Sequence, residues 1–186
     1  MSYRALCLLP LVLLLASCIR LPFARPLGDL KTAPIDKGLE GEWICLAPKK
    51  GEEKPVDLRF TLKEGGRWHL QFKGKGGWDT PVPVFTTIVV CDRYLNIGEP
   101  AVGYVVWKYS LSLDGTLMLA AMRDEHVATA IEKKRLKGKV VRYPDGGLAS
   151  FQVTDSVENI RAFIEKEDPE KLFGTIHSFR KAKSNK

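Results

Sequence analysis

Residues 56–73 read VDLRFTLKEGGRWHLQFK. Apolar and polar side chains alternate through residues 56–63 and again through residues 67–73, with Glu64-Gly65-Gly66 between the two runs. Alternation with a period of two turns one side of a strand toward the core and the other toward water. A short break that contains glycine between two such runs is typical of a β-hairpin. This stretch therefore predicts two antiparallel strands and a mainly β domain.

Further strands are predicted on both sides of this hairpin. A first strand begins at Gly41, and residues 84–96 form a longer β-rich run. Residues 104–113 place Trp107, Tyr109, Leu111 and Leu113 on one face, and a turn at Asp114-Gly115 leads into residues 117–122. The repeated alternation predicts an antiparallel meander with one buried face.

After residue 122, the apolar side chains follow the spacing of an α-helix. Asp124 can cap a helix whose Val127, Ala130 and Ile131 share one face, with Gly138 placed to end it. Asp155-Ser156-Val157-Glu158 is a variant of the capping box and predicts a second helix. Short strands are predicted at residues 139–143, 148–153 and 175–181. We expect an α+β fold that is mainly β: a curved antiparallel sheet or a barrel of about 8–9 strands with two short helices, whose last strand returns to the first.

Gly41-Glu42-Trp43 on the first strand and Arg180 on the last resemble the lipocalin arrangement, in which a G-x-W segment packs against a late arginine. The resemblance implies a lipocalin-like β-barrel over residues 40–183. The chain departs from lipocalins by placing a helix before its last three strands. More broadly, the domain resembles uncharacterised bacterial envelope lipoproteins with a lipocalin-like sheet. Residues 184–186 end the chain as a basic tail.

The N-terminal residues predict export. Residues 1–17 combine an early arginine with a short apolar run and small residues, as a secretory signal does. Leu15-Ala16-Ser17-Cys18 resembles the lipobox of bacterial lipoproteins, which implies that Cys18 becomes the acylated N-terminus. The alternative is an ordinary signal peptide with an incidental cysteine. In that family's sorting rule, Ile19 favours the periplasmic side of the outer membrane over the inner membrane. Residues 19–39 contain three prolines and predict a flexible tether. Residues 18–39 would thus comprise the cysteine that the resemblance implies to be lipidated, followed by this tether.

Two cysteines remain in the predicted domain, since Cys7 is removed with the signal. Cys45 and Cys91 would meet an oxidising compartment, where disulfides persist. They either form a bridge or remain thiols that pack as small hydrophobic side chains. The sequence leaves both alternatives open.

Basic residues dominate the charge of the chain, which is +7 at pH 7. They are concentrated in residues 133–142, KKRLKGKVVR, and in residues 180–186, RKAKSNK. Such a surface suits anionic lipid headgroups or an acidic envelope polymer. The sequence favours the alternative, a solvated helix face and a frayed tail. The basic residues are not interleaved with stacking aromatic residues, so no nucleic-acid partner is expected.

No catalytic or metal-binding motif is present. The chain lacks G-x-S-x-G, H-E-x-x-H and a phosphate-binding P-loop, and His69, His126 and His177 are far apart in sequence. We therefore expect no catalytic residues, no metal and no cofactor.

Aromatic residues on the predicted strands can all point inward. They form either a packed core or the lining of an apolar pocket, and they are Trp43, Trp68, Phe72, Trp107 and Tyr109. The sequence thus favours a lipid-anchored, non-catalytic envelope protein that binds a small apolar ligand or lipid. The alternative is a structural or interaction lipoprotein that holds an envelope protein through its outer surface, for instance through the basic helix after Asp124.

Overall fold

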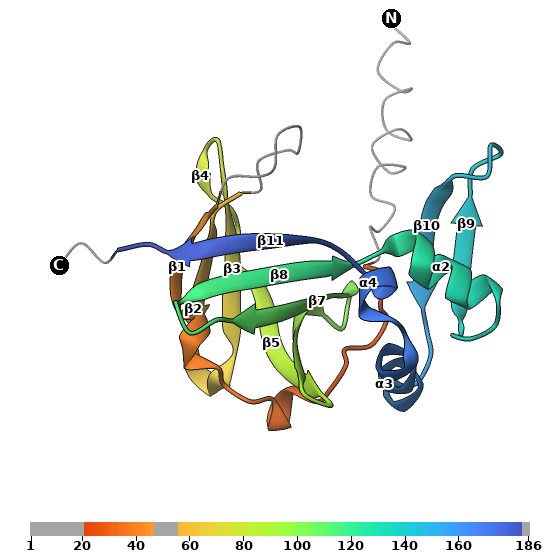
Figure 1. Cartoon of the computed structure of the whole chain (residues 1–186), viewed down its shortest axis with the longest axis horizontal. Helices are drawn as coiled ribbons and strands as arrows, with labels where there is room; N and C mark the ends of the chain where they lie inside the picture. Colours follow the sequence, from red (N-terminus) through yellow and green to blue (C-terminus); the bar gives the residue numbers. More distant parts are fainter. Residues whose placement is uncertain (1–20, 47–55, 184–186) are drawn as a thin grey trace, which may run out of the picture.

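A closed antiparallel β-barrel forms the main body of the protein in the computed structural model, which describes residues 21–46 and 56–183 (Figure 1). Its eight strands are β1 (Gly41–Cys45), β2 (Leu58–Leu62), β3 (Trp68–Gly74), β5 (Val82–Val89), β6 (Asp92–Glu99), β7 (Gly103–Leu111), β8 (Thr116–Met122) and β11 (Phe173–Lys181). The strands pair in the order β2-β1-β11-β8-β7-β6-β5-β3, and β2 pairs with β3 to close the ring. The short strand β4 (Gly77–Trp78) adds to β3. The prediction of a mainly β, lipocalin-like barrel is confirmed.

The predicted hairpin is β2 and β3, with Phe60 opposite Leu70 and Leu62 opposite Trp68. A 3-10 turn, η3 (Glu64–Gly66), joins the two strands. Gly65 adopts a φ of +78° there, in the left-handed region that glycine tolerates best. The prediction that the last strand returns to the first is also confirmed, because β11 pairs with β1.

Two details of the predicted strands are wrong. Residues 84–96 do not form one run: β5 and β6 meet at a tight turn where Val90 has a φ of +56°. Neither glycine nor proline marks this turn, so the sequence shows an unbroken β-rich run. Leu113 does not continue the buried face of β7 but is fully exposed in the turn between β7 and β8. A hydrogen bond from the Ser112 N–H to the Thr116 carbonyl, at 3.0 Å, closes this turn.

A smaller helical module lies at one end of the barrel (Figure 1). It contains α2 (Asp124–Glu132), β9 (Gly138–Arg142), β10 (Leu148–Val153), α3 (Val157–Lys166) and the short α4 (Pro169–Leu172). Strands β9 and β10 pair with each other as a separate hairpin and do not extend the barrel sheet. Both predicted helices are present. However, α2 ends at Glu132 and Gly138 begins β9, because the chain already leaves the helix at Lys134, whose φ is +59°.

Two hydrophobic clusters hold the fold together. One fills the barrel between strands and includes Trp43, Trp68 and Leu95. The other joins the outside of β5–β8 to the helices and includes Val127, Ile160 and other buried side chains of the module. The second cluster fixes the module against the barrel because apolar surface on both partners is removed from water.

The prediction of a flexible tether at residues 18–39 is wrong for residues 21–39, which are the part that the structure describes. Residues 21–39, here called the strap, run along the barrel with Phe23, Leu27 and Leu39 fully buried. Phe23 forms backbone bridges to Tyr104 and Val153, on β7 and β10. These buried residues show no period in the sequence, and their partners lie far away along the chain, so local pattern reading takes the segment for a linker.

The predicted signal peptide, Cys18 and the basic tail at residues 184–186 lie outside the described residues. Within the described part of the chain, no helix is both long enough and apolar enough to cross a membrane.

Candidate ligand pocket between the strap and the barrel

Asn96 clamps the strap onto the barrel. Its side chain is fully buried on β6, and its Oδ1 accepts a hydrogen bond from the Leu27 N–H at 2.7 Å. Its Nδ2 donates to the Thr87 hydroxyl on β5 at 2.8 Å. Buried polar groups are costly unless they are paired, so this network specifies where the strap lies.

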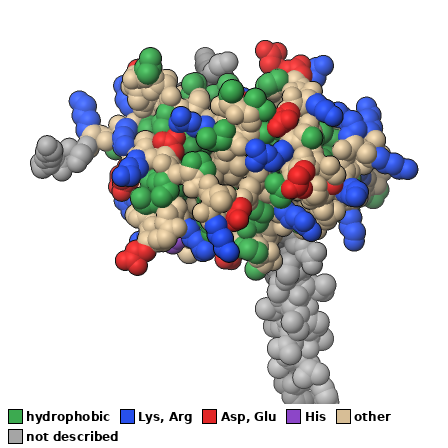
Figure 2. Space-filling model, turned by 90° about the horizontal axis from the view of Figure 1, so that it is seen from below, with side chains coloured by type: hydrophobic (Ala, Val, Ile, Leu, Met, Phe, Trp, Pro, Cys, Tyr) green, Lys and Arg blue, Asp and Glu red, His purple; other side chains and the backbone are tan. Residues whose placement is uncertain are grey.

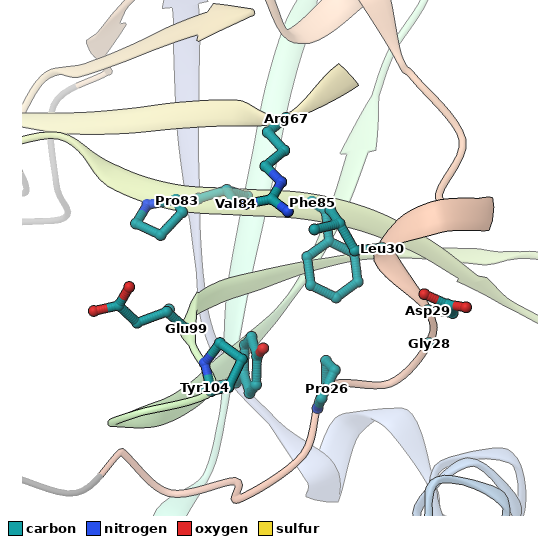
Figure 3. Close-up of a pocket in the computed structure, with 12 residues that line it drawn as sticks. Pro26, Gly28, Asp29, Leu30, Arg67, Pro83, Val84, Phe85, Glu99 and Tyr104 are labelled. Carbon is teal, nitrogen blue, oxygen red and sulfur yellow. The ribbon is translucent and has the colours of Figure 1, made fainter. Parts of the chain in front are cut away.

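A cavity of about 350 Å³ lies beside this clamp, where the strap passes the ends of three strands (Figure 3). Its lining residues come from the strap (Pro26, Gly28, Asp29, Leu30), the start of β3 (Arg67), β5 (Pro83, Val84, Phe85), β6 and its turn (Gly98, Glu99, Pro100) and β7 (Tyr104). We call this cavity the strap pocket. Its volume falls within the range of small-molecule sites, toward the lower end.

The β6–β7 turn is unusually tight beside the pocket. Gly98 has a φ of +133°, and a side chain there would place its Cβ 2.3 Å from the Gly103 carbonyl oxygen. The same Cβ would lie 2.9 Å from the Leu21 side chain. Glycine therefore lets the turn and the first residue of the strap approach each other at the pocket's rim.

Most of the pocket wall is apolar. Pro26 and Leu30 contribute from the strap, and Pro83 and Phe85 contribute from β5. Phe85 packs edge-on against Tyr104, with ring centroids 6.2 Å apart. Such a wall suits a hydrocarbon or an aromatic group.

Two polar side chains at the pocket have no hydrogen-bond partner among the described residues. Within the described residues, the Arg67 guanidinium and the Tyr104 hydroxyl form no hydrogen bond or ion pair. Figure 3 shows Arg67, the residue just before β3, reaching toward the cavity, and the Tyr104 ring lying across from it. Burial raises the pKa of Tyr104, the nearby Arg67 partly offsets this rise, and Glu99 adds to it. Tyr104 is thus a neutral hydrogen-bond donor at physiological pH.

Neither of the two carboxylates that line the pocket pairs with Arg67 within the described residues. Asp29 Oδ1 accepts a hydrogen bond from the Lys31 N–H at 2.9 Å, which caps a turn of the strap, η1 (Leu30–Thr32). The Glu99 carboxylate points away from Arg67 in Figure 3. Arg67 therefore remains available to an anionic group of a ligand.

The aromatic residues expected as pocket lining lie elsewhere, in and around the barrel core. Trp43, Trp68 and Tyr109 are buried in the barrel cluster, and Phe72 and Trp107 pack against it half-buried. None of these five lines the strap pocket. Arg67 and Tyr104 lie in no sequence motif, and the strap that completes the pocket has no periodic pattern that would distinguish it from a tether, so sequence patterns do not reveal this site.

The G-x-W resemblance holds only in part. Trp43 is buried on β1, and its Nε1 donates to the Leu39 carbonyl at 2.8 Å. The cation over its ring is Lys181, whose Nζ lies 5.5 Å from the ring centroid. Arg180 is exposed and pairs with Ile44, because the register of β11 places Lys181 opposite Trp43.

The two domain cysteines lie in different surroundings. Cys45 is buried on β1, and its Sγ donates to the Leu46 carbonyl at 3.0 Å. Cys91 is exposed in the β5–β6 turn. In the part of the chain that the structure describes, no disulfide joins them.

The histidines do not come together as a site. His69 lies on β3 and His177 on β11, whereas His126 of α2 contacts Glu167 with 2.6 Å between Nε2 and Oε2. Among residues 21–46 and 56–183, no group of three His, Cys, Asp or Glu side chains is placed to hold a metal ion.

Fold and site together define a strapped β-barrel with an apolar pocket, at whose rim lies an arginine that forms no ion pair with the described residues. No protein-family model, no curated protein and no solved structure matches the chain.

Proposed function

We propose that this is a lipid-anchored, non-catalytic protein of the bacterial envelope that binds a small apolar ligand or lipid in the strap pocket. Acylation at Cys18 would hold it on the membrane, with the periplasmic side of the outer membrane favoured by Ile19. The observation that carries the binding function is the combination of apolar walls with two donors, Arg67 and Tyr104, that have no hydrogen-bond partner within the described residues.

The pocket chemistry favours an amphipathic ligand with one anionic group. A guanidinium and a phenolic O–H both donate hydrogen bonds, and a carboxylate or phosphate oxygen accepts them with additional strength because it is charged. The hydrocarbon part of the same molecule would contact Pro26, Leu30 and Phe85. Glu99 at the rim would disfavour a ligand with several negative charges.

One observation favours the alternative, an interaction lipoprotein. Val141 and Tyr143 are more than half exposed at the end of β9, and β9 lies against α2. Between them in sequence, Arg142 bonds Glu132 of α2, with 2.6 Å between Nε and Oε1, which holds the strand to the helix. This small apolar surface beside α2 would suit a protein partner.

The test begins with the mature chain, residues 18–186, carrying Cys18→Ser so that no acyl chain is attached. Native mass spectrometry of the gently purified protein should show a bound mass that extracts as a lipid. The fluorescent fatty acid cis-parinaric acid then serves as the probe for titration. Arg67→Gln should weaken its binding at least tenfold, the effect of losing one hydrogen bond to a charged group.

Arg180→Gln is the matched control, because this exposed arginine on β11 lies outside the pocket. Binding of the probe that survives Arg67→Gln, or that falls equally with Arg180→Gln, would contradict the pocket assignment. The anchor is tested separately: radiolabelled palmitate should enter the wild-type chain and not the Cys18→Ser chain.

A further inference from the structure

A basic cleft of about 550 Å³ lies between α3 and the segment that joins α2 to β9. Its cations are Lys134, Arg135, Lys137 and Lys166, and its carboxylates are Asp155 and Glu167. We call it the basic cleft. Figure 2 shows Lys and Arg side chains gathered at the end of the molecule that carries α2, β9 and β10.

Both carboxylates of the cleft are already bound within the protein. Asp155 is almost fully buried and accepts hydrogen bonds from the Lys137 N–H at 2.8 Å and the Asn159 side chain at 2.8 Å. Glu167 bonds His126 and forms an ion pair with Arg135. These bonds hold the walls of the cleft together.

The lysines of the cleft are not neutralised in the same way. Lys134, Lys137 and Lys166 are exposed, and their ammonium groups form no hydrogen bond or ion pair within the described residues. Three exposed ammonium groups around one hollow favour a phosphate-bearing surface. Of these, the Lys137 charge also acts on the buried Asp155 carboxylate and helps to lower its pKa.

The cleft lies next to the point where the strap begins. The Val153 N–H donates to the Pro22 carbonyl at 2.7 Å, and the following Thr154 N–H donates to the Lys137 carbonyl at 2.9 Å. The strap therefore contacts Val153, the last residue of β10, and the next residue, Thr154, contacts Lys137 of the basic cleft.

An apolar tip flanks the other side of the strap's start. The Leu21 N–H donates to the Val102 carbonyl at 2.8 Å, in the β6–β7 turn. Pro100, Ala101 and Val102 are all exposed at this turn, with Val102 41% exposed. Apolar turn residues beside cations form the combination that suits a lipid–water interface.

The chain between Cys18 and Leu21 is too short to separate this face from a membrane. Three residues span about 11 Å when fully extended. Acylation at Cys18, which is part of the proposed function, would thus hold the apolar tip and the basic cleft close to the lipid headgroups.

We propose that this face docks onto an anionic membrane surface, with lipid phosphates between Lys134, Lys137 and Lys166 and with the 100–102 tip in the interfacial layer. The inference rests on the proposed lipid anchor and adds a defined orientation. It also places the rim of the strap pocket at the lipid surface, because Gly98–Pro100 belong to the same turn.

The test measures binding of the mature chain with Cys18→Ser to vesicles, so that no acyl chain contributes. Vesicles of phosphatidylcholine alone are compared with vesicles that contain phosphatidylglycerol, by co-sedimentation. We expect binding to the anionic vesicles alone, with a strong loss at high salt. Lys137→Gln with Lys166→Gln should weaken binding about 25-fold, since each lysine near an anionic surface contributes about fivefold.

The matched control is Lys75→Gln with Lys183→Gln, which removes the same charge from exposed positions elsewhere on the barrel. An equal loss in both double variants would overturn the proposal, because net charge and not the cleft would then bind. Absence of binding to anionic vesicles would overturn it as well. Palmitate labelling at Cys18 reports on the anchor by itself, so failure of the docking face is distinguishable from failure of the proposed function.

Discussion

Replacing Asn96 with alanine should loosen the strap and destabilise the whole domain. The Asn96 side chain accepts from the Leu27 N–H at 2.7 Å and donates to the Thr87 hydroxyl at 2.8 Å, and all of these groups are buried. Asn96→Ala leaves the Leu27 N–H without an acceptor. A lost buried hydrogen bond and an orphaned donor together cost about 3 kcal/mol.

Thermal unfolding of the mature Cys18→Ser chain gives the first readout. For a domain of this size, about 3 kcal/mol corresponds to a fall in Tm of roughly 6–12 °C. Hydrogen exchange gives the second readout, because the Leu27 amide should exchange much faster while the amides of β7 and β8 stay protected.

Gln71→Ala is the control, since this half-buried side chain donates one hydrogen bond to the Asp79 carbonyl at 2.8 Å. Its unfolding free energy should fall by about 1 kcal/mol or less. A change below 1 kcal/mol in Asn96→Ala, or an unchanged Leu27 amide, would refute the role of Asn96 as the clamp.

Two further predictions concern buried polar groups. In denaturant titrations, Trp43→Phe should lower the unfolding free energy by about 1 kcal/mol more than Trp68→Phe. The reason is that Trp43 Nε1 donates to the Leu39 carbonyl, whereas Trp68 Nε1 is buried without a hydrogen-bond partner among the described residues. Equal losses would contradict this. Burial raises the pKa of Asp155, but hydrogen bonds from Asn159 and two backbone N–H groups outweigh it, so the pKa lies below the ordinary 3.8. The ionised carboxylate therefore stabilises the fold above about pH 4, and this stability is lost as pH falls through the lowered pKa. The deficit of Asp155→Asn in urea titrations should shrink as pH falls below 4, and a deficit independent of pH would contradict the assignment.

Local sequence patterns predicted those helices and strands that are specified by residues close together in the chain. The alternation around Phe60 and Leu70 defines the β2–β3 hairpin, and the capping residues at 155–158 mark the start of α3. The observed cap is Ser156, whose side chain accepts from the Asn159 N–H. The β5–β6 turn escaped prediction because Val90 takes a positive φ that its residue type does not signal.

The sequence by itself indicated most of the strands and the placement of both longer helices. It also predicts an export signal over residues 1–17. Those features depend on side-chain periods and short motifs within a few residues. Only the tertiary structure decided that residues 21–39 form a strap, since Leu27 meets Asn96 across 69 positions. The same holds for the strap pocket, where Arg67 and Tyr104 converge from segments far apart in sequence, and for the basic cleft beside Pro22. These sites arise from contacts between distant segments, which only folding of the whole chain brings together.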